Sequence, residues 1–101
     1  MKIVVFGPAM RTGALLGHSI VDLSHACAKY LDEKDDEPNP LQLAEALVPS
    51  NLGGLIEGGT RALEYAETAL EHLRNQVQSK LGVNGETIEY PAKDVRVRAA
   101  G

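Results

Sequence analysis

Short runs of β-branched and aromatic residues lie near both ends of the chain, whereas apolar residues in the middle recur at helical spacing. Lys2–Phe6 reads KIVVF and stops at Gly7-Pro8, which predicts a buried strand. Two further apolar runs, residues 13–16 and 19–23, flank Gly17-His18. This pattern predicts a β-hairpin with a type II′ turn, because glycine readily adopts the positive φ that the first central position of that turn requires.

A helix is expected after the hairpin. Ser24 can cap it, since a serine hydroxyl accepts a hydrogen bond from a free N–H group of the first helical turn. Apolar side chains then share one helical face: Ala26, Cys27, Tyr30 and Leu31. Residues 32–37 carry five acids, which the negative end of the helix macrodipole disfavours, and Pro38 and Pro40 follow. We therefore expect a solvated loop over residues 32–37.

Two short helical segments are expected next. Residues 41–47 predict a helix with Pro40 at its first position, where the missing N–H group of proline costs nothing. Residues 51–56 predict one more helical turn, which Gly58-Gly59 ends.

The longest predicted element is an amphipathic helix over residues 60–81. Thr60 is its expected cap, and Gly82 its expected end in the left-handed conformation. One face is apolar at three- and four-residue spacing: Ala62, Ala66, Ala69, Leu70, Leu73, Val77 and Leu81. The other face is polar: Glu64, Glu67, Thr68, Glu71, Arg74, Asn75 and Gln78.

The last part of the chain returns to strand patterns. A turn at residues 83–85 precedes alternation over residues 86–90, which places Ile88 and Tyr90 on one face, and residues 94–98 alternate again. Strands at both ends with helices between them predict an α+β fold. We expect a small mixed β-sheet from N- and C-terminal strands, packed with about three helices, the longest near residues 60–81.

Composition limits the possible functions. The 101 residues favour one domain, and the net charge of -4 gives no general attraction to nucleic acid or to an anionic membrane surface. The single cysteine, Cys27, rules out an intramolecular disulfide, and no apolar run reaches the length of a membrane span. A cytoplasmic protein with no nucleic-acid or membrane partner is the expectation.

Candidate chemistry is sparse. His18, Asp22 and His25 form the one metal-binding pattern to consider, and with it a small metalloenzyme. Their expected positions, on a turn, at a strand end and in a first helical turn, do not favour a shared ion. A solvated His18 and a local hydrogen bond between Asp22 and His25 are the favoured interpretation.

The remaining reactive side chains also have structural interpretations. Cys27 lies on the apolar face of its helix, so a buried structural thiol is favoured over a nucleophile. Glu64, Glu67 and Glu71 lie opposite the apolar stripe and are expected to be a solvated surface. Gly7 and Gly13 lack the Lys-Ser/Thr continuation of a phosphate-binding loop.

The segment of residues 13–24, GALLGHSIVDLS, resembles the first hairpin of the N-terminal domain of the fumarylacetoacetate hydrolase (FAH) family. Family members often carry a short first strand, a small hairpin ending in Val-Asp-Leu-Ser, and then a helix. Here the same order reads KIVVF, GALLG, SIVDLS and the helix from Ser24. The resemblance continues through residues 52–59 (LGGLIEGG), the helix from Thr60 and the tail at residues 94–99, so it covers nearly the whole chain.

The resemblance implies one domain of an enzyme. Family members are metal-dependent hydrolases, isomerases or decarboxylases of oxo-acids, and their Mg²⁺ or Ca²⁺ ligands and catalytic His–Glu pair lie in a larger C-terminal domain. The Glu-x-Glu ligand motif is absent here, because Glu86 and Glu89 are three positions apart. We therefore expect no cofactor in this chain, and we assign no catalytic, cofactor-binding or metal-binding residue.

The implied organisation is an FAH-type N-terminal accessory domain over residues 1–98, with residues 99–101 starting a linker to an absent catalytic domain. Such a domain packs on the catalytic domain and shapes substrate access or subunit contacts. Its expected partner is that catalytic domain, and a homo-oligomer stays open. The alternative is a free-standing dimerisation or binding module, in which the long helix lends its apolar stripe to a partner.

Overall fold

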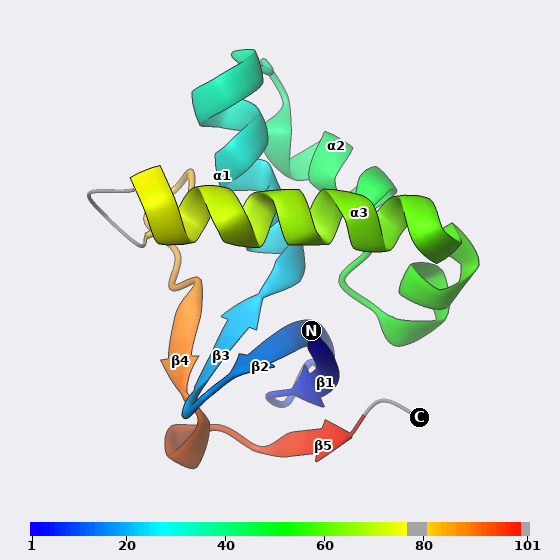
Figure 1. Ribbon diagram of the computed structural model, residues 1–101, viewed down its shortest axis with the longest axis vertical. Coiled ribbons are helices and arrows are strands. Elements are labelled where there is room, and N and C mark those ends of the chain that lie inside the picture. Colours follow the sequence, from blue (N-terminus) through cyan, green and yellow to red (C-terminus); the bar gives the residue numbers. More distant parts are fainter. Residues whose placement is uncertain (77–80, 100–101) are drawn as a thin grey trace.

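A computed structural model describes residues 1–76 and 81–99 of the chain (Figure 1). Strands lie at both ends of this described region and helices lie between them, as the sequence predicts for an α+β fold. The elements are, in chain order, β1 (Lys2–Phe6), β2 (Arg11–Leu16), β3 (Ser19–Asp22), α1 (Leu23–Asp35), α2 (Pro40–Leu47), α3 (Leu52–Gln76), β4 (Glu89–Pro91), the 3-10 helix η1 (Ala92–Asp94) and β5 (Val97–Ala99).

The strands of the described region form one sheet in the order β4-β3-β2-β1-β5. Every pairing is antiparallel, so the sheet is not the mixed one expected from the sequence. The strands β1, β2 and β3 form a meander at the centre of the sheet. Their antiparallel pairing allows short turns to connect them. The C-terminal strands then add to its two sides, β4 beside β3 and β5 beside β1 (Figure 1).

The hairpin of β2 and β3 confirms the prediction from Gly17-His18. Its register runs from Gly13 opposite Asp22 to Leu16 opposite Ser19. Gly17 has a φ of 62°, whereas His18 is not in the left-handed region, which is the sign pattern of a type II′ turn.

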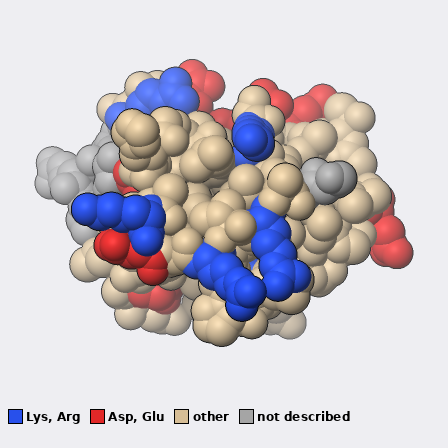
Figure 2. Space-filling model, turned by 90° about the horizontal axis from the view of Figure 1, so that it is seen from below, with Lys and Arg blue, Asp and Glu red and all other residues tan. Residues whose placement is uncertain are grey.

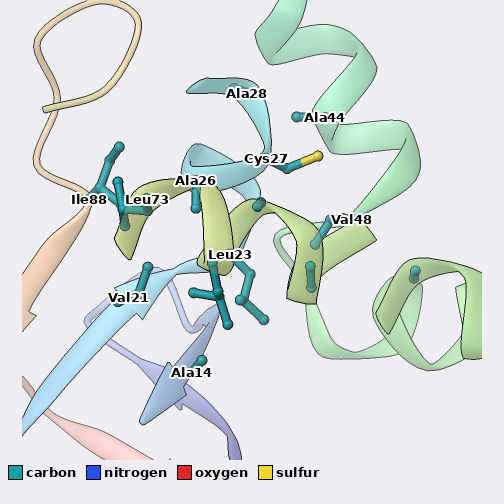
Figure 3. Packing of buried hydrophobic residues seen from close by; sticks show 14 of the residues in the cluster. Ala14, Val21, Leu23, Ala26, Cys27, Ala28, Ala44, Val48, Leu73 and Ile88 are labelled. Carbon is teal, nitrogen blue, oxygen red and sulfur yellow. The ribbon is translucent and has the colours of Figure 1, made fainter. Parts of the chain in front are cut away.

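The main core lies between the helices and one face of the sheet (Figure 1). The sheet contributes Ala14 and Val21, above which Leu23 and Ala26 of α1 and Leu73 of α3 converge (Figure 3). Many of the core side chains on α1 and α3 are alanines: Ala26, Ala28, Ala62, Ala66 and Ala69. Small side chains at a helix contact permit a short interaxial distance, so α1 and α3 pack closely.

The opposite face of the sheet is also apolar. Val4, Phe6 and Ile20 are buried there, and the rings of Phe6 and Tyr90 have centroids 5.3 Å apart. Ala92 and Val95, from the segment between β4 and β5, pack against the same cluster. This segment therefore covers the second face, and the sheet is apolar on both sides.

Helix α1 is capped two positions earlier than expected. Its N-cap is Asp22, whose carboxylate accepts a hydrogen bond from the His25 N–H group. Ser24 is not the cap, because it already lies inside the first turn and is buried. An aspartate is favoured at this position because its negative charge faces the positive end of the helix macrodipole.

Helix α1 also continues where a loop was expected. Residues 32–35 are helical, and the helix ends at Asp36, which has a left-handed φ of 49°. Lys29 lies 3.5 Å from Glu33 one turn later, and such a pair stabilises a helix. Lys29 thus partly offsets the charge of the acidic run, in which Asp32, Asp35 and Asp36 are exposed.

Helix α3 has the predicted break between its two parts. Gly59 has a φ of 59° and a ψ of -146°, a conformation that glycine adopts without a steric penalty. The second part carries the predicted stripe, of which five members are buried: Ala62, Ala66, Ala69, Leu70 and Leu73. Val77 and Gln78 lie outside the described residues.

The expected end of the long helix at Gly82 is wrong. Leu81 is half exposed and forms an isolated antiparallel bridge with Thr87. Gly82 donates to the carbonyl of Glu86 and has no positive φ, so it belongs to a turn that leads toward β4. A tight turn closes around residues 83–85, as predicted.

The C-terminal strands are shorter than expected. Ile88 lies in the main core, whereas Tyr90 packs on the other face of the sheet, so their predicted common face is wrong. The chain joins the sheet only at Glu89. At the position before it, the Ile88 carbonyl accepts a hydrogen bond from the Asp22 N–H group. Ala99, which was expected in a linker, lies in β5 and pairs with Val4 of β1.

A substitution at Gly13 tests how tightly the sheet, which is apolar on both faces, is packed. A β-carbon at this position would lie 2.8 Å from Ile20 Cγ2 and 2.9 Å from Phe6 Cδ1. We expect Gly13→Ala to lower the free energy of unfolding by about 1–3 kcal/mol, because Phe6 and Ile20 cannot move without disturbing the packing on that face of the sheet. Urea unfolding followed by circular dichroism measures this loss.

Gly53→Ala is the matched control for Gly13→Ala. Gly53 lies in α3, and its nearest relevant neighbour, Asn51 Oδ1, would be 3.6 Å from the new β-carbon. Alanine there should raise the free energy of unfolding by about 0.4–1 kcal/mol, because it restricts the unfolded chain. Equal effects of the two substitutions would contradict the packing argument.

Candidate functional site

The three residues of the candidate metal site do not come together. His18 is exposed in the hairpin turn, whereas Asp22 lies at the far end of β3. Four residues of extended chain span about 13 Å, which is too far for one ion to bridge. Of the described residues, no group of three or more histidine, cysteine, aspartate or glutamate side chains could hold a metal ion.

Asp22 is instead a fully buried structural carboxylate. Arg11 donates to both of its oxygens, from Nε to Oδ2 at 2.6 Å and from Nη2 to Oδ1 at 3.1 Å. The same carboxylate accepts from the His25 N–H group at 3.1 Å. The contact with Asp22 raises the pKa of Arg11, although burial acts in the opposite direction. Asp22 therefore joins β2, β3 and α1 at one point.

His25 confirms the expected local hydrogen bond to Asp22, through its backbone. Its ring Nδ1 is buried and has no hydrogen-bond partner among the described residues, and it lies 3.5 Å from Asp22 Oδ2. The carboxylate is already engaged by Arg11, so it cannot act as a free base toward a substrate. The arrangement is therefore a helix cap combined with an ion pair.

A second set of contacts ties β2 to the loop between α2 and α3. The buried Thr12 donates its N–H group to the Ser50 carbonyl at 2.7 Å and its hydroxyl to the Pro49 carbonyl at 2.9 Å. The Ser50 hydroxyl donates to Glu45 at 2.6 Å, and the Ser50 N–H group binds the same carboxylate. These bonds satisfy backbone groups that would otherwise be unpaired under α2.

A third polar cluster lies between α1 and α3. His72 Nε2 is 2.7 Å from Glu33 Oε1, and the ring also packs edge-on against Tyr30. Lys29 is 7% exposed and donates to the Leu81 carbonyl at 2.7 Å, while its ammonium lies 3.5 Å from Glu33. The cluster thus connects both long helices to the chain that leads into β4.

The environment of Glu33 sets its charge. Partial burial raises the pKa of Glu33, but the hydrogen bond with His72 and the neighbouring Lys29 outweigh burial, and the pKa is lowered overall. The ionised carboxylate is therefore the form that the fold favours. His72 Nδ1 is buried without a hydrogen-bond partner among the described residues.

Cys27 is the buried structural thiol that the sequence predicts. It is fully buried in the main core, next to Ala44 of α2 (Figure 3). Burial raises its pKa to about 11, so almost none of it is thiolate at neutral pH. Glu64, Glu67 and Glu71 are exposed on α3, also as predicted.

Sequence reasoning missed four participants in the ion pairs around Asp22 and Glu33: Arg11, Lys29, Glu33 and His72. The hairpin register gave a signal for Arg11. Gly13 lies opposite Asp22, and Arg11, two positions before Gly13, is on the same face of the sheet and therefore diagonally next to Asp22. The spacing of Lys29 and Glu33 also predicts a pair on α1. His72 had no such signal, since its partner lies 39 positions away in the sequence.

Comparisons with known proteins give no relative: no family model, curated protein or solved structure matches this chain. In the part of the chain that the structure describes, no helix has the length and apolar character needed to cross a membrane.

Asp22→Ala tests the joint between the hairpin and α1. The substitution removes the N-cap and leaves Arg11 without its partner, and we expect a loss of about 3 kcal/mol in the free energy of unfolding. Asp22→Asn should cost less, because its side-chain oxygen can still accept from the His25 N–H group. Asp32→Ala, at an exposed acid of α1, is the control and should stay within about 0.5 kcal/mol of the native protein.

Glu33→Gln tests the cluster between the long helices through its pH dependence. A lowered pKa means that ionised Glu33 stabilises the fold above its ordinary pKa of 4.5 and loses this effect as the pH falls through the lowered value. We therefore expect Glu33→Gln to be destabilising at neutral pH, with the difference from the native protein shrinking in acid. Urea unfolding at several pH values measures it.

Glu64→Gln, on the exposed face of α3, is the control for Glu33→Gln. It should change the free energy of unfolding by at most about 0.5 kcal/mol at every pH. A difference between Glu33→Gln and the native protein that is the same at neutral and acidic pH would show that the ionised carboxylate does not contribute.

Proposed function

We propose that this chain is a non-catalytic accessory domain of a fumarylacetoacetate-hydrolase-type enzyme, which packs on the catalytic domain and shapes substrate access or subunit contacts. The observation that carries the proposal is the role of Val-Asp-Leu-Ser, the segment on which the resemblance most depends. Val21 and Leu23 lie in the main core, and Ser24 is buried. Asp22 caps α1 and pairs with Arg11. The segment thus holds the hairpin and α1 together.

The order of elements supports the same proposal. A first strand, a small hairpin and a helix follow one another as the resemblance implies, and a helical break at Gly59 precedes the long part of α3. Asp22, Ser50 and Glu33, at the centres of the polar clusters, are each hydrogen-bonded within the fold. The described side chains are therefore suited to support a neighbouring domain, and the chemistry of the enzyme would come from that domain.

The test combines the purified chain with the catalytic domain of a family member from which its own N-terminal domain has been removed. We expect saturable binding by calorimetry and a change in the KM of the catalytic domain for an acylpyruvate. The chain alone should not hydrolyse the acylpyruvate. Hydrolysis by the chain alone would overturn the proposal, as would the absence of binding to catalytic domains from several family members.

The alternative, a free-standing dimerisation or binding module, makes a different prediction for the chain by itself. Sedimentation across a wide concentration range separates the two. A dimer that persists at low micromolar concentration favours the module, whereas a monomer that associates only with a catalytic domain favours the accessory role.

A further inference from the structure

We infer that the free edge of β5 is a binding surface for an extended, acidic segment of a partner protein, which adds to the sheet as an antiparallel strand. The inference does not require the accessory role proposed above, since it rests on the geometry and charge of β5 alone.

The backbone of β5 has unused hydrogen-bonding groups on its outer side. In the described sheet, β5 is the terminal strand and pairs only with β1. The Arg96 carbonyl accepts from the Gly7 N–H group at 2.9 Å, which places residues 96 and 98 at the positions that hydrogen-bond to β1. Because these positions alternate in an antiparallel ladder, the N–H and C=O groups of Val97 point away from β1.

Two arginines lie side by side on this edge. Arg96 and Arg98 line one shallow hollow of about 130 Å³, together with Val5 and Met10. Neither arginine forms an ion pair with a described residue, although the chain as a whole carries a net charge of -4. Val97, between them in the sequence, is 36% exposed, so the strand offers charge on one face and an apolar side chain on the other.

The surface around β5 has the same character. Figure 2 views the molecule from below, the side on which β5 and η1 lie in Figure 1. Basic side chains border uncharged surface in the middle of this face, and the acidic ones lie mostly near its outline (Figure 2). An acidic strand would therefore meet complementary charge where it joins the sheet.

The arginines also disfavour pairing of β5 with the β5 strand of a second copy of the chain. Antiparallel pairing of two β5 strands about Val97 would place Arg96 of each copy opposite Arg98 of the other. Like charges directly opposite one another destabilise a strand pair, and charged side chains on an edge strand are a common protection against self-pairing. A partner strand with Asp or Glu two positions apart, and an apolar residue between them, turns the same repulsion into attraction.

The probe for the test is a fluorescent peptide of alternating glutamate and valine. We expect it to bind the full chain, measured by anisotropy, and to slow hydrogen exchange of the Val97 N–H group. A peptide in which lysine replaces glutamate, and one of the same composition with the glutamates consecutive, are the ligand controls. Neither should match the alternating peptide.

Two variants separate charge from backbone pairing. The double variant Arg96→Glu with Arg98→Glu should weaken binding at least about tenfold, and Arg96→Lys with Arg98→Lys should retain most of it. Val97→Pro removes the outward N–H group, and an edge strand tolerates proline there because that group does not bond to β1. It should abolish peptide binding measured by anisotropy while the unfolding curve stays close to that of the native protein.

Binding that survives Val97→Pro would overturn strand addition. Equal binding of the glutamate and lysine peptides would overturn the role of the arginines. Tighter binding of a single-stranded oligonucleotide than of the peptide would show that the arginines serve a nucleic acid, and would also overturn the inference. None of these outcomes depends on binding to a catalytic domain, so failure here and failure of the accessory role are distinguishable.

Discussion

The fold depends most on one buried carboxylate. Asp22 ends β3, caps α1 and holds Arg11 of β2, so a single side chain sets the angle between the hairpin and the first helix. A buried charge is costly unless it is paired and hydrogen-bonded, and here the guanidinium and a helix N-terminus share that task. Its N–H group also binds Ile88, which brings β4 to the same junction.

A sheet that is apolar on both faces explains the rest of the architecture. The helices cover one face, and the segment from Tyr90 to Val95 covers the other, so the C-terminal chain must cross from β4 beside β3 to β5 beside β1. This path leaves β5 as an edge with arginines along it. The accessory role and the strand-binding edge are thus proposals about the outside of one packing unit.

Local patterns predicted a large part of this structure. The hairpin around Gly17, the helix after Asn39, the break at Gly59 and the buried alanines of α3 all follow from short-range spacing and turn chemistry. The polar clusters around Asp22 and Glu33 were harder to predict. Arg11 could be inferred from the hairpin register, but the pairing of His72 with Glu33 needs the packing of α1 on α3, which no spacing along the chain encodes.

The sequence by itself determined the α+β class, the hairpin, the apolar stripe of α3 and the burial of Cys27, because these depend on residues within a few positions of one another. Only the tertiary structure decided that Asp22 caps α1, that residues 32–35 stay helical, that Leu81 leaves the helix, and that Ile88 and Tyr90 face opposite ways. The first three involve a partner from another element: Arg11 of β2 binds Asp22, His72 of α3 binds Glu33, and Lys29 of α1 binds the Leu81 carbonyl. Long-range contacts can override local preference when they pair a buried polar group or fill a core.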